Sequence, residues 1–301
     1  MPQTPPGNDP PLDPRLHAYS PDLADARLRG RVAASRFVAG RPARVVAGRV
    51  PVRRRPQPRA SAAETETFYH YGEPLLVFEE ADGQAWCQSL EDGYVGYVAA
   101  HDIALGEPPP PTHVVATLGS YLYPAPDLRW SPSDFLPRHS RLVVVEPRQG
   151  LTTRGTDYAR LDTGGFLPSA CLATAPPRSS SLSEAAALYL GAPYLWGGRS
   201  FLGIDCSGLV QSAFRDLGIV VPRDTDLQRE AIGEPVEATG VAALRPDDLL
   251  YVPGHVLIHA GDGLVIHADG ASMTVRRDHL DDLVRAGRIA WDNIVVRRHH
   301  P

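Results

Sequence analysis

The stretch from Gly191 to Gly208, GAPYLWGGRSFLGIDCSG, constrains the fold more than any other part of the chain. Pro193 and the glycines that precede the cysteine prevent a regular helix or strand there. The following residues, SGLVQSAFRDLGI, place apolar side chains at helical spacing on one face. Gly218 follows the last of them, where helices commonly end. We therefore expect an irregular segment that leads into a helix beginning near Cys206.

A cysteine in the first turn of a helix is a candidate nucleophile. Free backbone N–H groups and the positive end of the helix dipole stabilise an anion there. We therefore expect the pKa of the Cys206 thiol to fall below the value of about 8.5 for a free cysteine. Asp205 and Ser207 flank it as candidate helix caps. The structural alternative is a buried cysteine that packs as a small apolar residue.

Composition excludes several classes of protein. A chain of 301 residues predicts two or three domains, and a net charge of −5 argues against a nucleic-acid partner. Only three cysteines occur, Cys87, Cys171 and Cys206, without the CxxC pairs of a zinc site. So sparse a set is no disulfide framework, and it favours a reducing compartment.

The N-terminal sequence, MPQTPPGNDPPLDPRL, lacks the basic start and apolar run of a signal peptide. Apolar runs elsewhere stay well below the roughly 18 residues of a membrane span. We therefore expect a soluble, cytoplasmic protein with no membrane partner. The alternative is a mature chain from which a signal has been removed.

The chain divides by composition into four parts. Residues 1–60 are rich in proline and predict an extension or linker that can hold a helix. Short β-prone runs split by turn signals predict a small barrel at 61–107. A second block with the same pattern predicts another barrel at 112–174. Residues 180–301 begin with helical patterns and continue with strands, which is typical of an α+β domain.

Two histidines are candidates to act on the cysteine. His255 begins the first strand of a hairpin whose turn is Gly261-Asp262-Gly263, and His267 lies near the end of its second strand. Paired across the hairpin, His255 can take the proton from Cys206 while His267 fixes its tautomer. A metal site formed with His259 is the alternative, which is disfavoured because no acidic ligand has matching spacing. We expect no metal and no other cofactor.

These motifs together resemble the NlpC/P60 cysteine peptidases. The matching segments are Tyr194-Leu195-Trp196-Gly197-Gly198, Asp205-Cys206-Ser207-Gly208, His255-Val256-Leu257-Ile258 and Ile266-His267-Ala268, within roughly residues 183–297. The two predicted barrels resemble bacterial SH3 (SH3b) domains. The whole arrangement is similar to the γ-D-glutamyl-L-diamino acid endopeptidases. The resemblance implies a papain-like fold for the last domain, preceded by two SH3-like barrels.

The resemblance also implies roles for individual residues. Cys206 matches the nucleophile, His255 the base, His267 the orienting residue, and Tyr194 a tyrosine whose hydroxyl assists the oxyanion site. The residues that match the lining of the substrate groove are Asp205, Ser207, Asp224 and Thr225. In the subgroup an Arg-Asp-Ser triplet holds the free amine of an N-terminal L-alanine. The triplet here reads Arg223-Asp224-Thr225, so threonine keeps the hydroxyl but adds a methyl group.

The first barrel of the subgroup closes one end of the groove with an acid and a tyrosine. The acid candidates in this chain are Glu73 and Glu66, and the tyrosine candidates are Tyr94 and Tyr97. No motif aligns them, and we take Glu73 and Tyr94 as the prediction. Packing within the barrel is the structural alternative.

The implied function is hydrolysis of the γ-D-Glu–diamino acid bond in murein tripeptides or tetrapeptides that carry a free N-terminal L-Ala, in cell-wall recycling. Two alternatives remain at this point. One is an enzyme that cuts intact peptidoglycan or another γ-glutamyl or acyl substrate. The other is a non-catalytic SH3b protein that binds peptidoglycan, against which the joint presence of Cys206, His255 and His267 argues.

Overall fold

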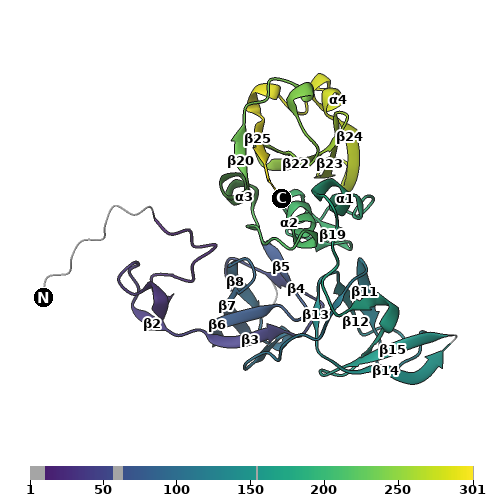
Figure 1. The fold of residues 1–301 in the computed structure, drawn as a ribbon. Coiled ribbons are helices and arrows are strands. Elements are labelled where there is room, and N and C mark those ends of the chain that lie inside the picture. The colour runs from purple at the N-terminus through teal and green to yellow at the C-terminus, as the bar shows by residue number, and fades with distance from the viewer. Residues whose placement is uncertain (1–10, 57–63, 154, 301) are drawn as a thin grey trace, which may run out of the picture. The chain divides into compact units, whose positions relative to one another are not determined.

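The computed structural model describes residues 11–56, 64–153 and 155–300 (Figure 1). The chain forms two compact units. The first holds the described residues up to Thr112 together with Ser140–Val143, and the second holds His113–His139 and the residues from Val144 onward. Strands dominate this mixed α/β fold. Among the described residues, no helix has the length and apolar character needed to cross a membrane.

The first described part of the chain forms strands, not the helix expected within residues 1–60. Strands β1 (Leu23–Asp25) and β2 (Arg36–Val38) pair in parallel, and a single 3₁₀ turn, Ala26–Leu28, follows β1. The carboxylate of Asp25 accepts a hydrogen bond from the backbone N–H of Arg27 and so caps that turn. Such local bonds compete with helix formation, and Gly30, at a φ of +83°, lies beyond the turn.

A five-stranded antiparallel sheet follows in the first unit, in the order β8-β7-β6-β3-β9. Its strands are β3 (Arg41–Val45), β6 (Pro74–Ala81), β7 (Gln84–Ser89), β8 (Val95–Ala99) and β9 (Ile103–Leu105). A second pair joins β4 (Arg49–Val52) to β5 (Thr67–His70). The core between them includes Val45, Val50, Tyr69, Leu75 and Val77.

The barrel strands begin before the predicted boundary at residue 61. Strand β3 pairs with both β6 and β9, and β4 pairs with β5, so neither belongs to a linker. Their sequences, RPARV and RVPV, hide a period of two in which Ala43, Val45, Val50 and Val52 are buried. The interleaved arginines and prolines make these segments read as a linker.

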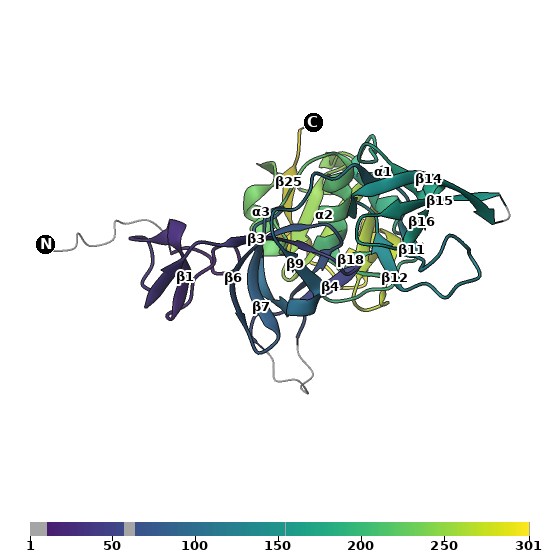
Figure 2. The ribbon, with the colours of Figure 1, turned by 90° about the horizontal axis from the view of Figure 1, so that it is seen from below.

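The second unit opens with another strand-rich segment. Strands β11 (Gly119–Leu122) and β12 (Asp134–Pro137) form one pair. Strands β14 (Val144–Thr153), β15 (Thr156–Leu161) and β16 (Phe166–Pro168) form a three-stranded sheet (Figure 2). Strand β10 (His113–Val115) pairs with β17 (Leu172–Ala173). The buried residues of this segment include Val115, Leu136, Tyr158, Leu161 and Leu167.

The rest of the second unit begins with helices, as the sequence predicts. Helix α1 (Leu182–Ala187) is capped by Ser181, whose hydroxyl accepts from the N–H of Glu184. Helix α2 (Cys206–Asp216) starts at the cysteine, and its C-cap residue, Leu217, immediately precedes Gly218. The short pair β18 (Arg199–Ser200) and β19 (Gly203–Ile204) lies before α2, and α3 (Thr225–Ala231) follows it.

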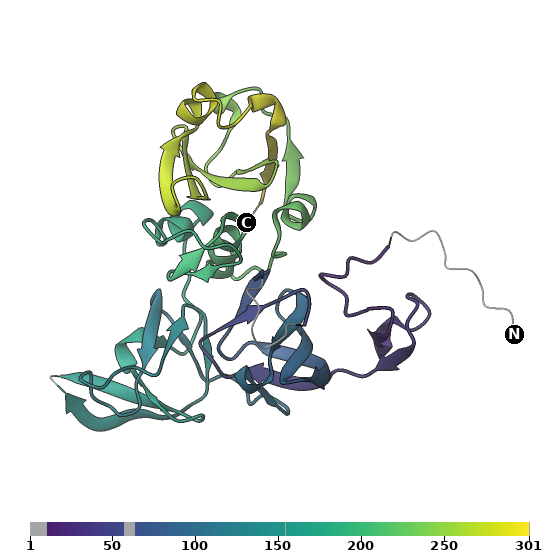
Figure 3. The same cartoon turned by 180° about the vertical axis from the view of Figure 1, so that it is seen from behind.

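A six-stranded antiparallel sheet completes the unit, in the order β20-β25-β21-β22-β23-β24. It belongs to the green and yellow part of the chain (Figure 3). The strands are β20 (Glu234–Val236), β21 (Leu249–Val252), β22 (His255–Gly261), β23 (Leu264–Asp269), β24 (Thr274–His279) and β25 (Val295–Arg298). The expected hairpin is β22 and β23. The helix expected at 278–286 is present as α4 (Leu280–Arg285). It begins two residues later than expected because β24 extends to His279.

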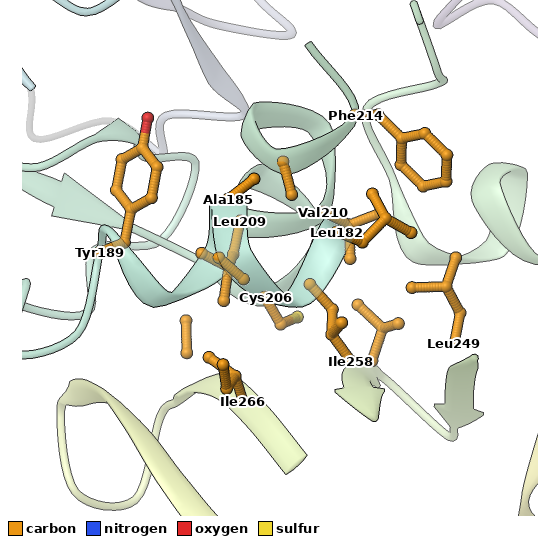
Figure 4. Packing of buried hydrophobic residues seen from close by; sticks show 14 of the residues in the cluster. Leu182, Ala185, Tyr189, Cys206, Leu209, Val210, Phe214, Leu249, Ile258 and Ile266 are labelled. Carbon is orange, nitrogen blue, oxygen red and sulfur yellow. The ribbon is translucent and has the colours of Figure 1, made fainter. Parts of the chain in front are cut away.

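Alternate residues of the sheet enter two separate cores. The first core packs Val256, Ile258 and Ile266 against α1 and α2, with Cys206 among the buried side chains (Figure 4). The second packs Leu257 and Val265 with α4 residues and with Val296 of β25. This alternation is the period of two expected for strands covered on both faces. It fixes the register of β22 and β23 on which the site depends.

The far end of α2 is anchored by a buried carboxylate. Asp216 is fully buried, and it receives two 2.9 Å hydrogen bonds from the guanidinium of Arg138 and lies 2.5 Å from His139 Nε2. The hydroxyl of Ser179 donates a further bond at 3.2 Å. A negative charge at the C-terminus of a helix is unfavourable for the dipole. The charged guanidinium of Arg138 and the hydrogen bond to His139, both from the segment between β12 and β14, compensate for it.

Candidate active site

The glycine-rich approach to α2 is shaped around Asp205. Its carboxylate accepts from Gly208 N at 2.7 Å, which caps the helix, and from Gly197 N at 2.8 Å, which holds the preceding loop. A Cβ atom at Gly208 would lie 2.1 Å from the carbonyl oxygen of Gly198. Only glycine fits so close to another backbone. The glycines that forbid regular structure in the sequence therefore let this loop fold against the start of α2.

Arg223 is buried near the start of α2, with 1% of its surface exposed. Its Nη2 lies 2.6 Å from Asp205 Oδ2, and its Nη1 donates to the Ser207 hydroxyl at 2.7 Å. Both acceptors flank Cys206 in the sequence. Asp205 and Ser207, predicted to line the substrate groove, are thus also parts of a buried network that fixes the first turn of α2.

The thiol of Cys206 lies at the start of α2, and its side chain points toward the strands that carry Ile258 and Ile266 (Figure 4). Burial, reinforced by the charge of Asp205, raises the pKa of Cys206 to about 11. Hydrogen bonds from the backbone of Val256 and Ser207 and the charge of Arg223 act in the opposite direction. The expectation of a lowered pKa is therefore wrong for the resting site, because burial outweighs the helix terminus.

His255 and His267 are in contact across the β22–β23 hairpin. The Ile258–Ile266 pair sets the register, which places His255 diagonally across from His267. The His255 Nε2 atom lies 2.9 Å from His267 Nδ1. Val256, whose backbone interacts with the thiol, immediately follows His255 in the chain. The structure thus brings the two histidines together next to the strand residue that contacts Cys206.

Both histidines are held in their neutral forms. Burial, aided by the neighbouring His267, lowers the pKa of His255 to about 4. Burial also lowers the pKa of His267, although the bond to Asp278 opposes this shift. At neutral pH the site therefore holds a thiol and an uncharged imidazole, not a thiolate–imidazolium pair. An imidazole in this state can accept a proton at the moment of attack.

Tyr194 lies against the loop that follows β23. Its backbone N–H donates to Met273 O at 2.9 Å, and the ring is 3.6 Å from the Cβ position of Gly270. Asp269 shapes that loop by accepting from the N–H groups of Ala271 and Ser272. Burial and the charge of Cys206 raise the pKa of Tyr194 to about 12, so its hydroxyl keeps its proton. A protonated phenol beside the cysteine is a hydrogen-bond donor for a developing oxyanion.

Asp224 and Thr225 stand at the start of α3. Asp224 occupies the N-cap position, yet its side chain makes no capping hydrogen bond to the helix, and Thr225 is the first helical residue. Both side chains are partly exposed. Gln228, one turn further on, donates to Ser207 O at 3.0 Å and so ties α3 to α2. The two residues thus sit on an element that is fixed to α2.

Glu73 and Tyr94 lie inside the first unit, with 1% and 2% of their surfaces exposed. Glu73 accepts from the Ser89 hydroxyl at 2.6 Å and from His70 N at 3.1 Å. The carbonyl oxygen of Tyr94 accepts from the hydroxyl of Tyr69. These contacts belong to the packing of the barrel itself. Their predicted role at the end of a substrate groove stays a prediction.

Sequence reasoning missed one residue of this site and underrated another. Asp278 Oδ2 lies 3.0 Å from His267 Nε2, but the charged run Arg276-Arg277-Asp278-His279 hides the strand that places it. Arg223 entered only as one member of a triplet. Arg223 follows Pro222 in the sequence, and no local pattern there predicts that its side chain is buried. Within the described residues, no cluster of three or more acidic, histidine or cysteine side chains could hold a metal ion.

Two segments of the chain match known protein families. Residues 191–286 match the NlpC/P60 family, and residues 52–103 match the bacterial dipeptidyl-peptidase Sh3 domain. A crystal structure of an NlpC/P60 family protein from Bacillus cereus superimposes with a TM-score of 0.66 at 18% identity. That alignment covers 86% of this chain and 100% of the other. At this identity the likeness concerns the fold.

Two relatives with assigned names are similar in sequence. Dipeptidyl-peptidase 6 of Lysinibacillus sphaericus is 28% identical over 230 residues, which cover 70% of this chain and 83% of that protein. A γ-D-glutamyl-L-lysine dipeptidyl-peptidase of Bacillus cereus is 32% identical over 111 residues, which cover 33% of this chain and 31% of the relative. The second match thus spans less than a third of that protein. Taken with the cysteine and histidines described above, these matches make the C-terminal part of the chain an NlpC/P60 domain, of a cysteine peptidase family, preceded by a bacterial SH3 domain.

Proposed function

We propose that the protein is a cysteine peptidase that hydrolyses the γ-D-Glu–diamino acid bond of short murein peptides with a free N-terminal L-Ala. The observation that carries this proposal is the position of Cys206 at the start of α2, beside the strand on which His255 contacts His267. The names of the relatives, which describe dipeptidyl-peptidases, support the choice of substrate.

The chemistry follows from the neutral resting pair. The Cys206 sulfur attacks the γ-carbonyl carbon while its proton passes to His255, and the carbonyl electrons move onto oxygen. The backbone N–H of Cys206 and the hydroxyl of Tyr194 donate to that oxyanion. As the intermediate collapses, the C–N bond breaks and the leaving amine takes the proton from His255. Water, deprotonated by His255, then attacks the thioester carbon; the C–S bond breaks, the dipeptide leaves as its carboxylic acid, and the proton returns from His255 to the Cys206 sulfur.

Recognition of the free amine is assigned to Asp224 and Thr225. A carboxylate pairs with an ammonium group by a charge-assisted hydrogen bond, and the threonine hydroxyl can accept another. A requirement for that amine restricts the enzyme to peptides already released from the glycan. We therefore propose a role in recycling such peptides in the cytoplasm. We also propose that residues 112–174 form a second SH3b barrel.

Two matched peptides test the proposal. L-Ala-γ-D-Glu-diamino acid is expected to be cleaved at least about 100-fold faster, in kcat/KM, than its N-acetylated form, because acetylation removes the ammonium group that would pair with the carboxylate of Asp224. Asp224→Asn is expected to weaken cleavage of the free peptide, whereas Asp226→Asn, at an exposed position of the same helix, leaves it unchanged. Equal rates on both peptides would instead indicate an enzyme for intact wall.

The pH dependence of kcat/KM is expected to extend unusually far into acid. His255 must be unprotonated to accept the thiol proton, and its pKa is lowered from 6.5 to about 4. About nine-tenths of the site is then active at pH 5, against a few per cent for an unshifted histidine. The charged groups that bear on His255 are Asp269, Arg288 and Asp205.

The same shift affects stability, so the fold must be followed in parallel. The unfolded chain binds a proton at His255 below pH 6.5 and the folded chain only near 4, so stability from this group is lost as the pH falls through that window. The measurement is kcat/KM from pH 4 to 8, with circular dichroism at each point. A midpoint near 6.5 in folded protein would contradict the prediction.

A further inference from the structure

A third polar residue extends the pair formed by His255 and His267. Asp278 of β24 lies on the same face of the sheet as His267 of β23. The register pairs His267 with Arg276, and Asp278, two residues after Arg276, points to the same side. Its Oδ2 atom lies 3.0 Å from His267 Nε2. The other oxygen, Oδ1, accepts from Arg276 Nη2 at 2.5 Å. Each oxygen of this carboxylate thus has its own donor.

The carboxylate decides where the protons of both rings lie. An ionised carboxylate can only accept, so His267 must carry its proton on Nε2. Its Nδ1 is then an acceptor, and it takes the Nε2–H of His255 across the 2.9 Å contact. His255 is left with an unprotonated Nδ1. That nitrogen is the one free to receive the proton of the thiol.

Burial disfavours ionisation of Asp278, but the hydrogen bonds from His267 and Arg276 outweigh it and keep the pKa of this carboxyl below its usual value. The side chain of His267 is almost fully buried, and that of Asp278 is 13% exposed. The carboxylate is therefore ionised over the whole pH range in which His255 is neutral. The acceptor role of Asp278 holds wherever the enzyme can work.

We propose that Asp278 is a positioning residue for catalysis: by accepting from His267 it sets the tautomer of both histidines and so presents the basic nitrogen of His255 to Cys206. The inference rests on the roles proposed for Cys206 and His255 but not on the identity of the substrate.

Asp278→Asn tests this role because Arg276 controls how the amide turns. The guanidinium can only donate and already bonds Oδ1, so we expect the amide oxygen to stay with Arg276 and the NH₂ group to face His267 Nε2. His267 must then carry its proton on Nδ1, and His255 loses its basic Nδ1. We expect kcat on a cleaved peptide to fall about 100-fold or more with KM within about threefold, as for loss of a general base.

A second substitution is expected to reverse the effect. In Asp278→Asn/Arg276→Met no guanidinium holds the amide oxygen, so that oxygen can turn to His267 and restore the original tautomers. We expect kcat to recover at least about tenfold relative to Asp278→Asn, and Asp278→Glu to recover part of it. Asp281→Asn, at an exposed position of α4, is the matched control and leaves kcat unchanged.

Imidazole ¹⁵N shifts provide a readout that needs no substrate. In the wild type both His255 and His267 are expected to be protonated on Nε2, and in Asp278→Asn on Nδ1. These spectra test the inference even if no murein peptide is cleaved, so its failure is separable from failure of the proposed function. A proton on Nδ1 of His267 in the wild type, or unchanged tautomers and kcat in a folded Asp278→Asn, would overturn it.

Discussion

Replacing Cys206 with alanine is expected to lower kcat/KM for peptide hydrolysis by about 10⁴-fold or more, because no other group in the site can form the thioester. Cys87 is fully buried in the barrel core of the other unit, and Cys171 lies outside the peptidase core. Neither stands beside a histidine pair. The rate of cleavage by purified Cys206→Ala under single-turnover conditions is the measurement.

The control for this experiment is Cys171→Ala, which removes a partly buried thiol from the same unit and is expected to leave kcat/KM within twofold. Thermal unfolding should show that Cys206→Ala loses only about 1 kcal/mol, since one small buried group is removed. Cleavage that persists in a folded Cys206→Ala protein at more than a hundredth of the original rate would rule out the thiol as nucleophile.

Arg223→Met is expected to destabilise the second unit by about 3–5 kcal/mol, because it leaves the carboxylate of Asp205 buried without its partner. The effect on chemistry has the same origin. The charge of Asp205 already raises the pKa of Cys206, and that of Arg223 opposes it. Without the arginine the thiol is harder to deprotonate, so kcat should fall together with stability. Urea unfolding and peptide cleavage measure the two effects.

Two further variants separate loss of a cation from loss of a buried pair. Arg229→Met removes an exposed arginine of α3 paired with Glu230, and its stability is expected to change by less than about 0.5 kcal/mol. Asp205→Asn/Arg223→Met removes both charges and is expected to regain most of the lost stability, since no unpaired ion remains. A double variant as unstable as Arg223→Met would show that the ion pair is not the cause.

The sequence predicts helix α2 well because its signals are local. Asp205 at the cap, the apolar spacing after Cys206 and Gly218 at the end all lie within one segment, and the helix forms between them. The hairpin with His255 and His267 is predicted for the same reason, since its turn is marked by Gly261-Asp262-Gly263.

Other features depend on distant partners, and there the sequence misleads. Strand β24 has a single buried apolar residue, Val275, so its charged residues read as the start of α4 and Asp278 goes unnoticed. The pKa of Cys206 is raised because of burial under the sheet, a quantity that no local pattern contains. Strand β3 is likewise recognisable only once its partners β6 and β9 are known.

The buried contact of Asp216 with Arg138 and His139 bears on how such a protein can be rearranged in evolution. A recombination point in the proline-rich stretch at 175–178 looks harmless in the sequence. Exchange of the sequence before that point would nevertheless remove Arg138 and His139. The carboxylate of Asp216 would then be buried without these partners at the C-terminal end of α2. The segment that carries Arg138 and His139 is therefore expected to be inherited together with the helix that carries Asp216.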